Sequence, residues 1–311
     1  MNARREAAER IGQRCDARVL EPSPPAVSEP PWFADDPVAR GDLEPGRTVV
    51  SPVATGDITW VELAAGDPEL GAWCADRWLG PYKRLVPVPG SLAMTRGSLQ
   101  QLAERVMAPA RRHANGKLGL RYTRHGFGTP FFGADMQVRV AGAELIIDED
   151  GHERSAPITT LDAAAALVGQ DALPADIELG GEPLHVDPYA VGFLGDWYGF
   201  GASVLEDLRV GAPDDGDASR VQLWPEHFDL ALVLGSERSG TRATYGLSPG
   251  DDQHPEPYAY VTPLIAQPPG DLWQATGFSG AELPYAELIA ARDQRATALE
   301  FFGMRASALA G

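Results

Sequence analysis

The stretch WPEHFDLALVLG (224–235), followed by a polar turn and ATYGLSPGDDQHPEPYAYVTP (243–263), decides the fold of this chain. Its apolar runs are rich in Leu, Val and Tyr and are bounded by Gly, Pro and Asp, which is typical of short strands separated by turns. The pattern predicts strands over 220–235, 242–247 and 258–264.

Upstream, residues 117–158 alternate apolar and polar side chains between glycine-containing turns, which predicts an antiparallel meander. Helical periodicity predicts helices over 94–113, 161–168, 183–210 and 285–304. Groups of strands and helices in uneven blocks favour an α+β fold, a mainly antiparallel sheet flanked by helices, over a doubly wound nucleotide fold.

The N-terminal region differs from the rest of the chain. Residues 2–18 are rich in Ala, Arg and Glu, which predicts a helical arm, and prolines recur from there to Pro45. We therefore predict a helical arm and Pro-rich connector over 1–45 and a single α+β body over 46–311, with sub-halves 46–180 and 181–311. Because the arm is locally basic on an acidic protein, it is a candidate for homo-oligomer contacts.

Composition excludes several classes of partner. The 311 residues carry a formal net charge of −18, which would repel nucleic acid and anionic membranes. No apolar run approaches the roughly 20 residues of a membrane span, and the first residues lack the apolar core of a signal peptide. Two distant cysteines make neither a disulfide framework nor a thiolate zinc site. We predict a cytoplasmic protein.

His227 and Asp229 are the strongest candidates for chemistry. If 220–235 is one strand, its period of two places both on one face, whereas Phe228 and Leu230 face the other way. Burying this pair is unfavourable unless the two side chains bond each other, act together in proton transfer, or hold a metal. His227 would then be the proton shuttle and Asp229 the residue that orients it.

A second histidine, His254, follows on a proline-rich loop that could return to the same place. Together with His227 and Asp229 it has the composition of a facial-triad ligand set for a non-haem divalent metal. The alternative is that all three residues are structural. Trp224, Tyr258 and Tyr260 are the predicted ligand-binding side chains around them.

The segments LWPEHFDLALVLGS, YGLSPGDDQHPEPYAYVTP and AELPYAEL, in this order, resemble a mainly actinobacterial family of unknown function. The resemblance extends weakly back to about Leu99. It places His227, Phe228, Asp229, Pro249, Gly250, Tyr258 and Tyr260 at family-motif positions. The family has no established activity, so the resemblance implies no reaction.

Three functions stay open from the sequence. The first is a small-molecule-binding protein, or an enzyme, with a pocket centred on His227 and Asp229. The second is a non-catalytic protein that self-associates through residues 1–45 and uses its histidines structurally. The third is a non-haem metal-dependent enzyme that uses His227, Asp229 and His254.

Overall fold

The computed structural model describes residues 84–311 except 124–125, 131, 133–135, 150–151, 178, 213–216 and 266–269. Of the first 83 residues it describes 32–33, 49–51, 58–69 and 71. The predicted arm and connector therefore lie outside the described residues, apart from β1 (Trp32–Phe33). This strand joins β2 (Val49–Ser51) and β3 (Ile58–Thr59) in a small parallel sheet, followed by α3 (Trp60–Gly66).

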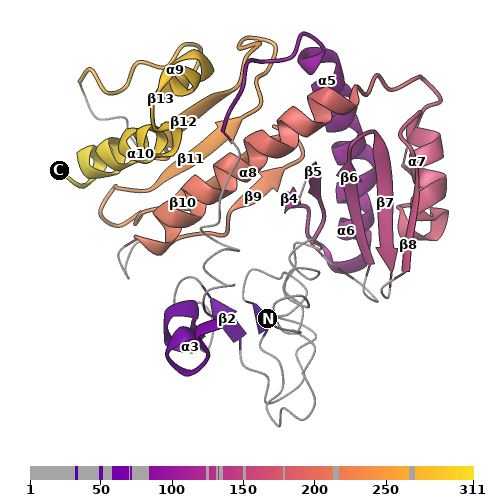
Figure 1. Cartoon of the computed structure of the whole chain (residues 1–311), viewed down its shortest axis with the longest axis horizontal. Coiled ribbons are helices and arrows are strands. Elements are labelled where there is room, and N and C mark those ends of the chain that lie inside the picture. The colour runs from indigo at the N-terminus through magenta and orange to yellow at the C-terminus, as the bar shows by residue number, and fades with distance from the viewer. Residues whose placement is uncertain are drawn as a thin grey trace.

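The predicted α+β class is confirmed by two five-stranded antiparallel sheets flanked by helices (Figure 1). The β4–β8 sheet comprises β4 (Arg121–Thr123), β5 (Gly126–Gly128), β6 (Met136–Ala141), β7 (Glu144–Glu149) and β8 (His152–Pro157), in sequence order. The β9–β13 sheet comprises β9 (Gln222–Trp224), β10 (Asp229–Leu234), β11 (Ala243–Ser248), β12 (Tyr258–Pro263) and β13 (Ala281–Pro284), also in sequence order.

The long helix α8 (Pro188–Val210) holds the two sheets together. It contacts strands of both sheets and runs diagonally across them (Figure 1). Asp187 caps the helix by accepting a hydrogen bond from the Tyr189 N–H at 2.8 Å, and Pro188 occupies the first turn, where its missing N–H leaves no bond unmade. The backbones of Leu120 and Leu223 exchange hydrogen bonds of 2.7 and 2.8 Å, which directly bridges the sheets beneath the helix.

The predicted helix over 94–113 is longer and not uniform. It consists of α5 (Leu92–Leu102), a π-helical turn (Ala103–Met107) and α6 (Ala108–Asn115). Pro109 does not end it, because the wide turn that precedes α6 accommodates a residue without an N–H. Gly116 ends it instead, with a φ of 75°.

Four further elements complete the described body: α7 (Leu161–Val168), a short 3-10 turn (Gln170–Ala172), α9 (Tyr285–Ala290) and α10 (Gln294–Ala310). The predicted helix over 285–304 is therefore split in two. Asp293 begins α10 by accepting a hydrogen bond from the Ala296 N–H at 3.0 Å. Among the described residues, no helix has the length and apolarity needed to cross a membrane.

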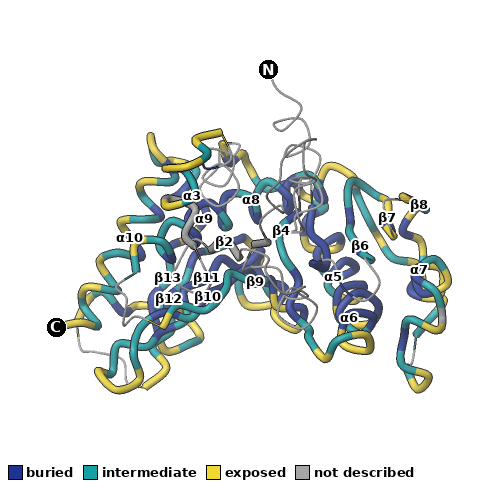
Figure 2. The backbone as a smooth tube through the Cα atoms, turned by 90° about the horizontal axis from the view of Figure 1, so that it is seen from below, coloured by how far each residue is buried: buried dark blue, intermediate teal, exposed yellow. Residues whose placement is uncertain are grey.

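The β9–β13 sheet has one apolar face and one mixed face. Leu230, Leu247 and Val261 are buried on the face that packs against α8 and α10. The buried residues accordingly lie in the middle of the molecule, and exposed residues lie around them (Figure 2). Asp229 and Tyr260 belong to the opposite face, which α8 leaves uncovered.

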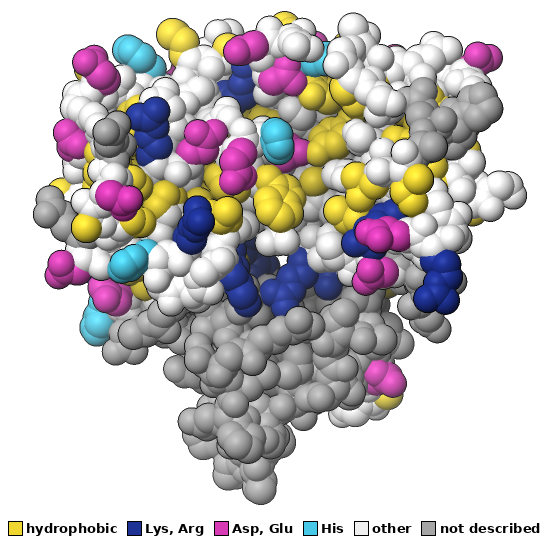
Figure 3. Space-filling view, turned by 180° about the vertical axis from the view of Figure 1, so that it is seen from behind, with side chains coloured by type: hydrophobic (Ala, Val, Ile, Leu, Met, Phe, Trp, Pro, Cys, Tyr) yellow, Lys and Arg dark blue, Asp and Glu magenta, His cyan; other side chains and the backbone are white. Residues whose placement is uncertain are grey.

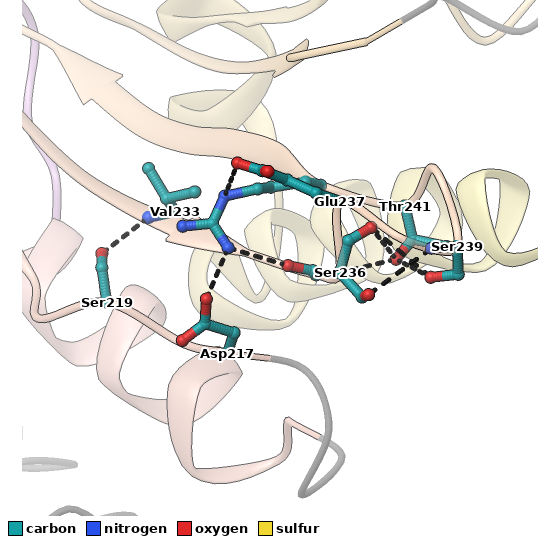
Figure 4. A network of polar contacts seen from close by, with 9 residues as sticks. Asp217, Ser219, Val233, Ser236, Glu237, Ser239 and Thr241 are labelled. Atoms are coloured by element: carbon teal, nitrogen blue, oxygen red, sulfur yellow. Dashed lines mark hydrogen bonds and ion pairs between the residues drawn. The ribbon is translucent and has the colours of Figure 1, made fainter.

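A polar network fixes the far end of the β10–β11 hairpin (Figure 4). The Arg242 guanidinium lies 2.8 Å from Asp217 and 3.7 Å from Glu237, and it donates a 3.2 Å hydrogen bond to the Gly235 carbonyl. These contacts stabilise the loop that joins β10 to β11, and they therefore help to fix the register between the two strands.

Candidate functional site

The predicted single strand over 220–235 is wrong at its centre. A tight turn over 225–228 separates β9 from β10, and Phe228 has a left-handed φ of 53°. A bulky residue adopts this conformation only when the surroundings hold it. Here the Phe228 N–H donates to the Trp224 carbonyl at 2.7 Å, and the buried Tyr198 hydroxyl donates to the Phe228 carbonyl at 2.7 Å. His227 is therefore an exposed turn residue and does not share a strand face with Asp229.

A cavity of about 550 Å³ opens on the uncovered face of the β9–β13 sheet. Its described lining consists of Gln100, Glu226, His227, Asp229, Ser248, Gly250, Asp251, Asp252, Gln253, His254, Tyr258, Tyr260, Thr262, Gly277 and Phe278. The face of the molecule turned away from α8 shows hydrophobic side chains with acidic and histidine side chains beside them (Figure 3).

Asp229 is the deepest charged group of this cavity. Its exposure is 5%, and its Oδ2 accepts a hydrogen bond from the Tyr260 hydroxyl. Its Oδ1 is buried and accepts no hydrogen bond from any residue that the structure describes. One oxygen of this buried carboxyl is thus left without a hydrogen-bond donor among the described residues, which is uncommon for a buried polar atom.

Gly246 makes the Asp229–Tyr260 contact feasible. Tyr260 lies on β12, and Gly246 is directly opposite it on β11, the strand between β12 and β10. A Cβ on Gly246 would lie 2.3 Å from the Tyr260 Cζ and 2.5 Å from its hydroxyl oxygen. The tyrosine ring therefore lies flat across the glycine, which lets its hydroxyl reach past the intervening strand.

Burial controls the protonation of this pair. Burial raises the pKa of Asp229, whereas the Tyr260 hydrogen bond and the nearby His227 act to lower it. The pKa of Tyr260 is raised by burial and by the negative charge of Asp229. Tyr198 lies on α8 and donates to the Phe228 carbonyl, next to Asp229 in the chain. Its pKa is also raised, mainly by burial. A buried carboxyl with a raised pKa in a cavity is a common mark of a functional site.

A compact loop over 249–257 forms one wall of the cavity. Asp251 Oδ1 accepts hydrogen bonds from the N–H groups of Gln253 at 2.7 Å and His254 at 2.8 Å. Its Oδ2 accepts one from the Tyr258 hydroxyl at 2.9 Å. Although burial acts to raise the pKa of Asp251, these bonds outweigh it and the pKa is lowered. Asp251 is therefore a charged and well-satisfied carboxylate.

His254 is held between two carboxylates. Its Nδ1 lies 3.5 Å from Asp251 Oδ1, and its Nε2 lies 3.2 Å from Glu282 Oε2. Its ring packs on Tyr258, with 4.6 Å between the ring centroids. His254, rather than His227, is thus the histidine that the fold orients at this site.

The loop is anchored from below by a buried cation. The Arg96 guanidinium of α5 donates to the carbonyls of Pro249 at 3.3 Å and Pro255 at 3.4 Å. Gly250 has a φ of 95°, and a Cβ there would lie 2.5 Å from Arg96 Nη1 and 2.7 Å from the His254 carbonyl. Only glycine fits this position without strain.

The structure brings most of the predicted site residues to one cavity. His227, Asp229, His254, Tyr258 and Tyr260 all line it. Trp224 does not: it pairs with Asp229 in the β9–β10 register, but its side chain is 37% exposed and lies away from the lining.

The predicted metal set is not assembled. Within the described part of the chain, no group of three or more His, Cys, Asp or Glu side chains is arranged to hold a metal ion. His227, Asp229 and His254 are among these described residues, and they line the same cavity without forming such a group.

The predicted site residues leave out much of the cavity lining, including Gln100, Ser248 and Phe278. Ser248 could have been found, because its place in YGLSPGD puts it directly opposite Tyr258 once the strands are paired. Gln100 and Phe278 lie on a distant helix and a distant loop, and no local pattern marks them.

Comparison of the chain with protein-family models, curated proteins and solved structures finds no match. The resemblance to a family of unknown function therefore stays a prediction, and the function has to be argued from the cavity.

Proposed function

We propose that this protein binds a small organic molecule in the cavity on the open face of the β9–β13 sheet. The observation that carries the proposal is the buried Asp229 carboxyl in the cavity lining, whose Oδ1 has no hydrogen-bond partner among the described residues. Leaving such an oxygen unsatisfied costs about 1–3 kcal/mol. A ligand that supplies the missing donor recovers this free energy.

The build of the cavity supports the same proposal. Small-molecule sites are concave, are roughly 300–1,000 Å³ in volume, and combine aromatic surface with placed polar groups. The volume here is about 550 Å³. Tyr258, Tyr260 and Phe278 supply aromatic surface, and their ring centroids lie 6.1–6.3 Å apart.

The predicted catalytic pair is revised in this proposal. The hydrogen bond to Asp229 comes from Tyr260 and not from His227. Any proton transfer in the cavity would therefore involve Asp229 directly, with Tyr260 as its positioning residue. Self-association through residues 1–45 and a cytoplasmic location stay predictions, and a deletion of 1–45 followed by measurement of the oligomeric state tests the former.

A blocked cavity provides the test. Thr262 lines the cavity on β12, and Thr244 lies directly opposite it on β11 without lining the cavity. Thr262→Phe should therefore fill part of the cavity, and Thr244→Phe is its matched control.

The wild type and both variants would be screened by thermal shift against one library of neutral, anionic and cationic metabolites, with hits confirmed by calorimetry. We expect hits that stabilise the wild type and Thr244→Phe but not Thr262→Phe. If every hit also stabilises Thr262→Phe equally, or if the library yields none, the cavity is not the binding site.

A further inference from the structure

We infer that the ligand of this cavity is an organic ammonium ion, with its N–H groups on Asp229 and its carbon substituents against the aromatic wall. This inference rests on the proposed function and names the ligand class of the same cavity. Three independent features of the lining carry it: the sign of its charge, the unsatisfied oxygen of Asp229, and the arrangement of its aromatic rings.

Acidic side chains outnumber the two histidines, His227 and His254, in the cavity lining. Four carboxylates line the cavity: Glu226, Asp229, Asp251 and Asp252. None of the described lining residues is Lys or Arg. Carboxylates of this density repel an anionic ligand and attract a cation, and a partly enclosed cavity concentrates that field.

The buried Arg96 guanidinium is engaged by the backbone of the loop. Arg96 is 7% exposed and lies behind the loop, where it donates to the carbonyls of Pro249 and Pro255. It is not part of the cavity lining. Arg96 therefore contributes no side chain to the lining that a ligand would contact.

The unsatisfied Oδ1 of Asp229 selects for a donor. Oδ2 accepts a hydrogen bond from the Tyr260 hydroxyl, so Oδ1 is the carboxyl oxygen that still lacks a donor among the described residues. An ammonium group supplies both a hydrogen-bond donor and a positive charge, and charge-assisted hydrogen bonds are about twice as strong as neutral ones. Burial, which raises the pKa of Asp229 in the empty cavity, is then offset by the ligand's charge.

The aromatic wall suits the remainder of such a ligand. Tyr258, Tyr260 and Phe278 are inclined to one another at 31–81°, so they form a corner rather than a flat stack. Aromatic faces attract organic cations through their quadrupoles, and they also remove the carbon substituents from water. A hydrated inorganic ion would use neither property.

The test compares amines with uncharged and anionic counterparts of the same shape. The series runs from butylamine and phenethylamine to agmatine, and butanol, 2-phenylethanol and phenylacetate serve as counterparts. Dissociation constants would be measured by calorimetry at constant ionic strength on the full chain. Asp229→Asn removes the charge and keeps the shape, and Glu237→Gln, at an exposed carboxylate of the β10–β11 loop, is the matched control.

We expect at least one amine to bind roughly tenfold or more tightly than its alcohol, and phenylacetate to bind more weakly than 2-phenylethanol. Asp229→Asn should weaken that amine roughly 10- to 100-fold and leave the alcohol nearly unchanged, whereas Glu237→Gln should change neither.

Two failures can be told apart. If the alcohols or phenylacetate bind as well as every amine and Thr262→Phe abolishes their binding, the cavity binds small molecules but the ammonium class is wrong. If no compound of either kind binds and the metabolite library also yields no hit, the proposed function fails with it. Amine binding that Asp229→Asn leaves unchanged overturns the assignment of Asp229 as the anchor.

Discussion

Gly246→Ala tests the contact on which the site depends. The added Cβ would lie 2.3 Å from the Tyr260 Cζ and 2.5 Å from Cε1, far inside any tolerated contact. The backbone of β11 needs no change, because Gly246 is not among the residues with positive φ. The tyrosine ring has to leave its place, and its hydroxyl then no longer reaches Asp229.

The magnitude follows from two opposing effects. A buried carboxyl without its hydrogen-bond donor costs about 1–3 kcal/mol. Alanine in place of glycine returns roughly 0.4–1 kcal/mol, because it restricts the unfolded chain. We therefore expect Gly246→Ala to lower the free energy of unfolding by about 1 kcal/mol, and by no more than about 2.6 kcal/mol, measured by urea denaturation.

The same substitution in a Tyr260→Ala background decides whether this reasoning is correct. Without the ring, the alanine at 246 meets no obstacle, so the effect should change sign and stabilise the protein by about 0.4–1 kcal/mol. An equal destabilisation in both backgrounds would refute the argument, because the cost of the alanine would then be independent of Tyr260.

Three further predictions concern stability. Burial raises the pKa of Asp229 in the folded protein. The contribution of the protonated carboxyl to the free energy of unfolding is therefore fully present below the unfolded-state pKa of about 3.9, and it is lost as the pH rises through the folded-state pKa. Asp229→Asn should therefore gain stability over the wild type on going from pH 4 to pH 8, by about 1.4 kcal/mol per unit of pKa shift, and a difference independent of pH in urea titrations would contradict this. Arg96→Met should speed amide hydrogen exchange in residues 249–256, since each lost hydrogen bond weakens the loop by about 1 kcal/mol. Unchanged exchange would mean that the other contacts of the loop stabilise it without Arg96. Gly303→Ala, inside α10 with open space around it, should stabilise by about 1 kcal/mol, whereas Gly235→Ala, with a φ of 101° and a backbone carbonyl 2.3 Å from its Cβ, should destabilise; thermal melts of this pair check the contrast.

The sequence predicted the parts of the fold that local pattern controls. The alternation over 117–158 corresponds to β4–β8, and the runs at 242–247 and 258–264 correspond to β11 and β12 within one residue. Tyr258 and Tyr260, two residues apart on β12, lie on one face of the sheet, and both line the cavity. The pattern could not show that Phe228 would take a left-handed conformation, because a hydroxyl on α8 holds it there.

The errors about the site have the same origin. An unbroken strand would put His227 beside Asp229. The turn over 225–228 interrupts the strand, and His227 is exposed instead. Phe278 completes the aromatic corner from a loop between β12 and β13, so its role depends on tertiary packing alone. Residues of this kind carry no signal in one sequence, since nothing local distinguishes them from other loop residues.

The two faces of the β9–β13 sheet place opposite demands on stability. The face toward α8 and α10 buries Leu230, Leu247 and Val261 and so stabilises the fold. The other face buries Asp229, which is unfavourable whenever the carboxyl is charged and Oδ1 has no partner. Stability alone does not favour this arrangement. The proposed ligand would supply, in the complex, the hydrogen bond that Oδ1 lacks among the described residues.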